Sequence, residues 1–333
     1  MIASTASPPL AAPAPEPRIA ILVPCHNEEL TIGEVVRAFR AELPKARIYV
    51  CDNNSTDRTA EIAAEAGAIV MYESQQGKGH VVQAMFHRID ADVYVMVDGD
   101  DTYPASAVHT LIEPILNDTA DMVIGSRLQH GTRSAFRALN LFGNRMYLFV
   151  LKRLFGVTLT DLLSGYRAFS RRFVSGTPLF GGGFETEAEM TIRALQRRFR
   201  LVETAVDLRA RPAGSESKIR IVRDGMVILT SMLALMRDYK PLTFFGSVGL
   251  LLIAIGLVPG VVVIVEYLRT GLIARIPSAI FAVGAILAGV ISGLVGIILH
   301  TIAQRFRELD FHLQMMSDDL RRSFSQNDSH PRR

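Results

Sequence analysis

The chain has 333 residues, 49% of them hydrophobic, and a formal net charge of +3. This length accommodates two domains or one large domain with added elements, and so small a charge gives no sign of a nucleic-acid-binding protein. The two cysteines, Cys25 and Cys51, lie far apart and lack metal-ligand spacing, which argues against a disulfide framework and fits a reducing cytoplasm.

The first 17 residues are rich in proline and alanine. They lack both the basic start and the unbroken apolar core of a signal peptide. We therefore expect residues 1–17 to form a disordered leader.

Residues 18–127 alternate short apolar runs with helical patterns, which is typical of a parallel sheet with crossover helices. Strands are expected at 18–24, 47–52, 68–72, 92–98 and 120–127. In open α/β sheets, ligands bind beyond the carboxyl ends of the strands. Four of these ends carry polar clusters, so we expect them to form one site: PCHNEE, CDNNSTD, DGDDTYP and GSR.

The cluster after the fourth strand holds three carboxylates, Asp98, Asp100 and Asp101, in four positions. Like charges this close repel one another, so a positive partner is expected. One interpretation is a solvated turn in which Pro104 begins a helix. The other is a divalent cation that carries a phosphorylated ligand.

Several phosphate-handling classes compete for this motif. A dinucleotide-binding domain would need G-x-G-x-x-G after the first strand, and the GKG at 77–79 is not a Walker motif. A haloacid-dehalogenase-like phosphatase would use Asp98 as nucleophile and Asp100 as acid/base. That motif normally follows the first strand of its domain, and here it follows the fourth. In a nucleotide-sugar transferase, Asp98 and Asp100 would instead hold Mg²⁺ or Mn²⁺ on the donor diphosphate.

The C-terminal third contains two runs without charged residues, 242–265 and 276–299. As helices, each is long enough for the ~30 Å hydrocarbon core of a bilayer. A pair of buried core helices is the alternative. We expect transmembrane helices at about 242–266 and 276–300, with the catalytic part and a tail at 304–333 both in the cytoplasm. Basic flanking residues favour this orientation modestly: Arg237, Lys240, Arg305 and Arg307 against Arg269 and Arg275 in the short loop.

Seven motifs occur in the order found in glycosyltransferase family two: VPCHNEE, CDNNSTDRT, GKG, DGDDTYP, GSR, DLLSGYRAFSR and GSESKI. Over roughly residues 18–224 the chain resembles the dolichyl- and polyprenyl-phosphate sugar synthases, such as the dolichol-phosphate mannosyltransferases. Its two-span tail resembles the bacterial glucosyltransferase members. The resemblance implies a GT-A, Rossmann-like, mostly parallel sheet with flanking helices over 18–235.

The resemblance also implies roles at the donor site. Pro24, Asn27 and Glu28 would line the nucleoside pocket, and Asp52 would contact the base. Lys78 would lie near the donor phosphate or ribose. Asp98, Gly99 and Asp100 would form the metal-facing D-x-D, with Asp98 and Asp100 as ligands. Thr102 stands where the family often has a glutamine as third ligand.

At the acceptor site, the resemblance places four residues around a lipid phosphate: Arg127, Arg211, Ser217 and Lys218. Such a phosphate is largely dianionic at neutral pH, so a general base is dispensable. If a base exists, Asp161 is the first candidate, ahead of Glu185 and Glu187. A helix cap or a partner of Arg167 is the structural alternative for Asp161. The resemblance implies inversion at the anomeric carbon.

Residues 136–156 mix aromatic, aliphatic and basic side chains. This composition suits an amphipathic helix in the headgroup region, and a partly buried core helix is the alternative. The tail after residue 304 also has an amphipathic pattern, which suits self-association.

Together these features predict a metal-dependent inverting glycosyltransferase at the cytoplasmic face of a membrane. It would move a hexose from a nucleotide sugar to a polyprenyl or dolichyl phosphate, with UDP favoured and GDP-mannose the other donor. A chain without tryptophan cannot carry the Q-x-x-R-W motif of processive synthases. The alternatives are the phosphatase and a non-catalytic membrane-tethered scaffold. A homo-oligomer is a further expectation.

Overall fold

The computed structural model describes residues 16–127, 148–149, 151–153, 156–177, 186–208, 230, 233–234, 236–238, 240–273 and 275–327. The chain divides into two compact units, Met1–Gly225 and Met226–Arg333. Nearly all of the expected leader lies outside the described residues, as does most of the expected helix at 136–156. Four expected site residues also lie outside them: Glu185, Arg211, Ser217 and Lys218.

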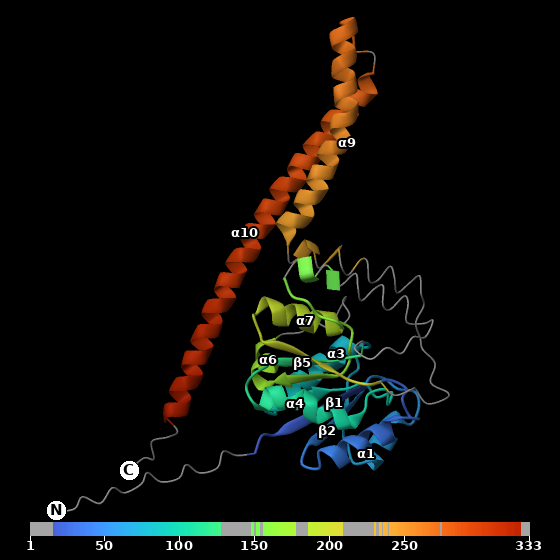
Figure 1. The fold of residues 1–333 in the computed structure, drawn as a ribbon, viewed down its shortest axis with the longest axis vertical. Coiled ribbons are helices and arrows are strands. Elements are labelled where there is room, and N and C mark those ends of the chain that lie inside the picture. The colour runs from blue at the N-terminus through green and yellow to red at the C-terminus, as the bar shows by residue number, and fades with distance from the viewer. Residues whose placement is uncertain are drawn as a thin grey trace, which may run out of the picture. The chain divides into compact units, whose positions relative to one another are not determined.

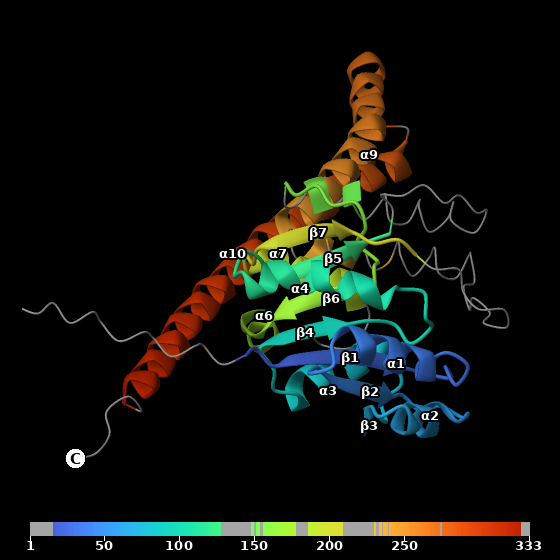
Figure 2. The same cartoon turned by 60° about the horizontal axis from the view of Figure 1, so that its bottom comes forward.

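A seven-stranded sheet forms the centre of the first unit, in the order β3-β2-β1-β4-β6-β5-β7 (Figure 2). All neighbouring strands are parallel except that β6 runs antiparallel to both β4 and β5. The expected mostly parallel α/β sheet is therefore confirmed, although β6 and β7 were not predicted. The strands are β1 (Ile19–Cys25), β2 (Arg47–Asp52), β3 (Ile69–Tyr72), β4 (Val93–Met96), β5 (Met122–Ser126), β6 (Arg167–Ser170) and β7 (Leu201–Ala205).

Helices cover both faces of the sheet (Figure 1), because successive side chains of a strand point to opposite faces. Ile21 and Val23 of β1 pack in one core with side chains of α1, α2 and α4. Ala20 and Leu22 pack in the other core with α3, α6 and α7. The helical elements are α1 (Ile32–Glu42), α2 (Thr59–Glu65), α3 (Lys78–Arg88), the 3₁₀ turn η1 (Ala105–Ala107), α4 (Val108–Leu116), α6 (Arg171–Gly176) and α7 (Thr186–Gln196).

The reversed direction of β6 has a consequence for the functional edge. The carboxyl ends of β1, β2, β4 and β5 lie at one edge of the sheet, and β6 begins at that edge. Residues just before β6 therefore meet residues that follow β4.

The second unit contains a hairpin of two long helices, α9 (Pro241–Thr270) and α10 (Ile276–Asn327). Within the described part of the chain, two segments are long and apolar enough to cross a membrane, Pro241–Thr270 and Ile276–Phe306, which indicates membrane association. Helix α9 extends past both ends of the span expected at 242–266, whereas α10 begins where the span at 276–300 was expected to begin and extends past its end. Gly271, with φ at +72°, ends α9 in a left-handed conformation.

Small residues allow the two helices of the hairpin to approach closely. A Cβ on Gly249 would lie 2.6 Å from the carbonyl oxygen of Gly289, and one on Gly289 would lie equally close to that of Gly249. The hydroxyl of Ser292 in α10 also donates a hydrogen bond to the carbonyl of Phe245 in α9, at 2.9 Å. Close backbone contact and interhelical hydrogen bonds are the interactions that hold helices together in lipid.

Candidate active site

Backbone and side-chain contacts join the ends of β1, β2 and β4. The amide of Asn53 donates to the carbonyl of Cys25 at 2.9 Å, and the hydroxyl of Thr31 donates to the carbonyl of Gly99 at 2.6 Å. A Cβ on Gly99 would lie 2.7 Å from the Cys25 sulfur, so a glycine is required at this contact. The polar clusters after these three strands therefore meet at one edge, as expected from the sequence.

The turn after β1 is fastened to the turn after β2. Asn27 has a positive φ of 56°, and its side-chain oxygen accepts a hydrogen bond from the amide of Thr56 at 2.8 Å. The amide of Glu28 donates to the hydroxyl of Thr59 at 2.8 Å. Pro24 lies within β1 one residue before its end. These contacts give the expected nucleoside side of the site a fixed backbone.

Asp52, at the end of β2, is 6% exposed. Its Oδ2 accepts a long hydrogen bond, 3.4 Å, from the amide of Ser55. Its Oδ1 is buried and has no hydrogen-bond partner within the described part of the chain. An unpaired buried carboxylate oxygen costs free energy until a donor reaches it, so Asp52 is suited to accept a hydrogen bond from a ligand.

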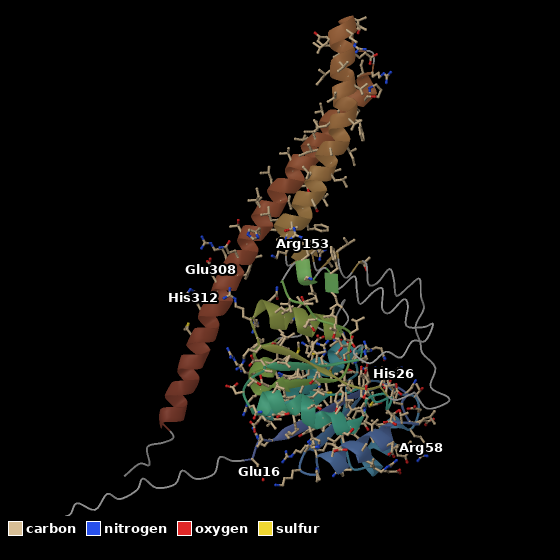
Figure 3. All side chains as sticks on the ribbon, viewed as in Figure 1. Glu16, His26, Arg58, Arg153, Glu308 and His312 are labelled. Atoms are coloured by element: carbon tan, nitrogen blue, oxygen red, sulfur yellow. The ribbon has the colours of Figure 1, made fainter. Side chains whose placement is uncertain are left out.

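Asn53 shapes the loop that leads to α3. Its side-chain amide donates to the carbonyls of Glu73 and Gln75, at 2.9 and 2.8 Å. Its side-chain oxygen accepts from the amide of Gly77 at 2.7 Å. His26, labelled in Figure 3, donates from its ring Nδ1 to the Asn53 carbonyl at 2.9 Å. Gly77 has φ at +132°, which only glycine adopts readily, and the next residue begins α3.

That next residue is Lys78, and its ammonium lies between two carboxylates. Nζ is 2.5 Å from Oδ1 of Asp98 and 2.5 Å from Oε1 of Glu187 in α7. Burial would lower the pKa of Lys78, but the two carboxylates raise it well above its ordinary value. Lys78 is therefore a permanent positive charge at neutral pH and a cationic partner of Asp98.

Asp98 also lies against the segment before β6. A Cβ on Gly165 would overlap the Asp98 carboxylate, so Gly165 leaves the room that this side chain occupies. The amide of Gly165 donates to the hydroxyl of Tyr103 at 3.0 Å, and Tyr103 is buried. This contact fixes Gly165 beside Asp98.

Asp100 is 7% exposed, and its Oδ1 accepts from both the hydroxyl and the amide of Thr102, at 2.6 and 3.2 Å. Thr102 thus orients Asp100. No group of three His, Cys, Asp or Glu side chains that could hold a metal occurs in the described ranges. Magnesium is often held by one or two carboxylates, with phosphates and water completing its shell, and the oxygens of Asp98 and Asp100 fit that requirement.

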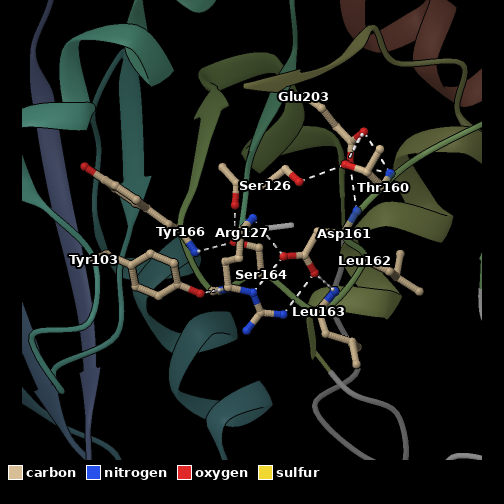
Figure 4. Close-up of polar contacts among 12 residues, drawn as sticks. Tyr103, Ser126, Arg127, Thr160, Asp161, Leu162, Leu163, Ser164, Tyr166 and Glu203 are labelled. Atoms are coloured by element: carbon tan, nitrogen blue, oxygen red, sulfur yellow. Dashed lines mark hydrogen bonds and ion pairs between the residues drawn. The ribbon is translucent and has the colours of Figure 1, made fainter. Parts of the chain in front are cut away.

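Arg127 follows β5 and forms a bidentate pair with Asp161 (Figure 4). Nε donates to Oδ2 at 2.7 Å and Nη2 to Oδ1 at 2.9 Å, and the Arg127 amide also donates to Oδ2. Asp161 is fully buried, whereas the Arg127 side chain is 30% exposed. Burial would lower the pKa of Arg127, but its hydrogen bonds with Asp161, with smaller contributions from Tyr103 and Asp98, raise it far above its ordinary value.

Asp161 does not form an ion pair with Arg167, although the sequence suggested Arg167 as one possible partner. Arg167 is fully buried and donates to the carbonyls of Leu162 and Ser164 and to the hydroxyl of Thr191. Burial lowers its pKa to about 10. Arg167 therefore stays charged at neutral pH and ties the loop before β6 to α7.

The prediction from the sequence missed one residue of this site, Gly165, and gave another, Glu187, only a secondary role. Gly165 stands in the quoted DLLSGYRAF motif, and no pattern marks it as a neighbour of Asp98. Glu187 was considered only as a secondary base, and its pairing with Lys78 joins segments 109 residues apart. Such a long-range contact leaves no signal in a single sequence.

Comparisons with known proteins decide the family. The protein-family model described as glycosyl transferase family 2 matches residues 20–176 of the chain. Glycosyltransferase AglJ of Haloferax volcanii is 32% identical over 305 residues, which cover 90% of this chain and 100% of the relative. The chain belongs to glycosyl transferase family 2. A relative from the same organism named dolichyl-phosphate hexose transferase is 31% identical over 63% of this chain and 90% of the relative.

Membership of glycosyl transferase family 2 makes the protein a glycosyltransferase and sets aside the phosphatase and scaffold interpretations. Solved structures support the fold. Glucosyl-3-phosphoglycerate synthase from Mycobacterium tuberculosis, in complex with uridine-diphosphate, has a TM-score of 0.55 and 22% identity. The match covers 66% of this chain and 79% of that chain. The expected GT-A fold is thus confirmed.

Proposed function

We propose that this glycosyltransferase moves a hexose from a nucleotide sugar to a polyprenyl phosphate. The observation that carries the proposal is the arrangement of charges at one edge of the sheet, where Lys78 contacts Asp98 and the partly exposed Arg127 follows β5. Cationic groups beside a pair of carboxylates suit a reaction between two phosphorylated molecules. The relative named dolichyl-phosphate hexose transferase supports the lipid acceptor.

On the donor side, Asp98 and Asp100 would hold Mg²⁺ or Mn²⁺, with Gly99 between them. The cation would neutralise charge on the departing nucleoside diphosphate. Structures of the mycobacterial synthase are described with Mn²⁺ and with Mg²⁺ together with uridine-diphosphate, which supports this choice. Lys78 would provide a further positive charge toward the diphosphate.

For the base, Asp52 would accept a hydrogen bond through its unpaired Oδ1. Uracil offers one ring N–H, whereas the corresponding edge of guanine offers a ring N–H and an amino group. A carboxylate with one unpaired oxygen suits the single donor, so we favour UDP over GDP. Pro24, Asn27 and Glu28 would form the wall of the nucleoside pocket from the fixed turn after β1.

On the acceptor side, Arg127 would bind the lipid phosphate, together with Arg211, Ser217 and Lys218. The phosphate oxygen bonds to the anomeric carbon while the bond from that carbon to the donor diphosphate breaks, with inversion. A dianionic phosphate needs no proton removed. Because Arg127 donates to both oxygens of the buried Asp161, we assign Asp161 a positioning role in preference to that of a general base.

The helical hairpin would keep the catalytic unit at the membrane surface, on the cytoplasmic side. An interfacial helix over 136–156 would help to present the lipid phosphate. In its described part, Phe149 is 69% exposed while Leu151 is 3% exposed, so an apolar side chain is available to contact lipid while another packs inside the protein. The cytoplasmic tail and the homo-oligomer stay predictions.

The test is transfer by the purified full chain in detergent, with UDP- and GDP-sugars, polyprenyl phosphate and either Mg²⁺ or Mn²⁺. We expect lipid-linked hexose from a UDP-sugar, and its loss when EDTA is added. Asp100→Ala should lower kcat/KM by about a hundredfold or more. Asp101→Asn is the matched control, because Asp101 has φ at +54° and asparagine tolerates that conformation. Full activity in Asp100→Ala would contradict the metal role.

A further inference from the structure

We infer that Glu187 is a positioning residue that holds the Lys78 ammonium in place for the diphosphate of the donor. The inference rests on the proposed nucleotide-sugar function, and it concerns a residue that would act on the donor through Lys78. It assigns a buried carboxylate to the binding of an anion, a role opposite to the one its own charge suggests.

The geometry around Lys78 separates the two carboxylates. The Glu187 side chain is 8% exposed, whereas Asp98 is 31% exposed and Lys78 32% exposed. Asp98 is also a candidate metal ligand, so its carboxylate would bind the metal ion as well as the Lys78 ammonium during the reaction. Glu187 is buried in α7, where it can keep Lys78 in position while Asp98 binds the metal ion.

Glu187 is itself held by an ordered chain of hydrogen bonds. The hydroxyl of Thr191 donates to the Glu187 carbonyl one helical turn away, at 2.9 Å. The fully buried Arg167 donates to that hydroxyl at 2.7 Å and also binds the loop before β6. These contacts fix the first turn of α7, which carries Glu187, relative to the loop next to Asp98.

Two effects of Glu187 on the donor have opposite signs. By Coulomb's law alone, a carboxylate near a diphosphate repels it, so removing that carboxylate would strengthen binding. If Glu187 holds Lys78 in place, removing it leaves a long, flexible side chain to be ordered when the donor binds, which weakens binding. The sign of the change therefore distinguishes the two effects.

The experiment compares the affinities of UDP and uridine for the full chain in detergent, in the presence of Mg²⁺, by equilibrium dialysis. Uridine lacks the diphosphate, so an effect through Lys78 appears for UDP alone. We expect Glu187→Gln to weaken UDP binding about tenfold and to leave uridine binding unchanged. Lys78→Met should lose at least as much. The double variant should bind UDP no more weakly than Lys78→Met, because Glu187 acts through Lys78.

Glu189→Gln is the matched control, since Glu189 lies in the same helix, is also buried and is paired with Arg193. It should leave UDP binding unchanged. Glu187→Asp keeps the charge and should retain most of the affinity, which guards against a folding defect in Glu187→Gln. Stronger or unchanged UDP binding in Glu187→Gln, or an equal loss for uridine, overturns the inference. If the wild-type chain binds neither UDP nor GDP, the proposed function itself fails.

Discussion

Arg127 and Asp161 form a pair joined by two hydrogen bonds, in which the Asp161 side chain is fully buried and the Arg127 side chain is 30% exposed. Asp161 is anchored in turn, because its amide donates to Glu203 at 3.0 Å and its Oδ1 accepts from the amide of Leu163 at 3.2 Å. The pair therefore fixes the guanidinium plane while leaving part of Arg127 accessible. A lysine could not reproduce this two-bond geometry.

Asp161→Asn should raise the KM for polyprenyl phosphate about tenfold and change kcat less, because Arg127 loses its orientation while the acceptor keeps its reactivity. The donor KM should change little. Steady-state kinetics with varied acceptor and donor measure this split. A fall in kcat of a thousandfold or more, with loss of the acidic limb of the pH profile, would show instead that Asp161 is a general base.

Gly165→Ala should lower kcat/KM by about a hundredfold, since a methyl group at that position overlaps the Asp98 carboxylate and must displace it. The folded protein should persist, as judged by its thermal midpoint. Gly176→Ala is the control: it adds the same methyl group in α6, where the nearest atom, in Phe199, is 3.4 Å away. Equal activity in the two variants would contradict the proposed position of Asp98 in catalysis.

Asp121→Asn should reduce the free energy of unfolding at pH 7 by about 1–3 kcal/mol. It should also make the free energy of unfolding less dependent on pH in the acidic range. Burial would raise the pKa of Asp121, but hydrogen bonds from the side chain and amide of Arg200 hold it below its ordinary value. Because the pKa of Asp121 is lower in the folded than in the unfolded protein, its charge stabilises the fold at any pH above the unfolded-state pKa of ~3.9. This stabilisation is lost as the pH falls through the folded-state pKa.

The thermal midpoints of wild type and Asp121→Asn at pH 7 and below pH 4 measure this contribution. The difference between the two proteins should narrow in acid. A difference that stays constant with pH would assign the loss to packing and would contradict the role of the charge.

Gly289→Leu should destabilise the α9–α10 hairpin, because its side chain would meet the backbone of α9 at Gly249. We expect faster proteolysis and a lower thermal midpoint in detergent. Gly284→Leu is the control, since a Cβ at Gly284 meets nothing within 4 Å. If Gly284→Leu is as unstable as Gly289→Leu, helix propensity or insertion would explain both results instead.

The first five strands could be predicted because each is an apolar run followed by polar residues at a shared edge. β6 could not, because it spans four residues and begins with an arginine, a type rarely buried completely. That arginine is buried here because neutral oxygens from three neighbouring residues accept its hydrogen bonds.

The candidate site shows the same limit. Asp98, Asp100 and Lys78 stand in recognisable motifs, so the sequence indicated them. Their contacts with Gly165 and Glu187 could not be predicted, because these contacts join segments that lie far apart in the sequence. A positive charge is present beside Asp98 as Lys78, a residue that the family resemblance placed near the donor phosphate or ribose.

The antiparallel direction of β6 makes the position of Asp98 sensitive to strand register. If β6 slipped by two residues, each of its side chains would stay on the same face of the sheet. Gly165 would nevertheless move about 6–7 Å along the strand axis, away from Asp98. A bulkier neighbour would then stand against the carboxylate. Insertions between β5 and β6 are therefore tolerated only where they leave this pairing unchanged, so variation in length should concentrate away from the residues that join Gly165 to β6.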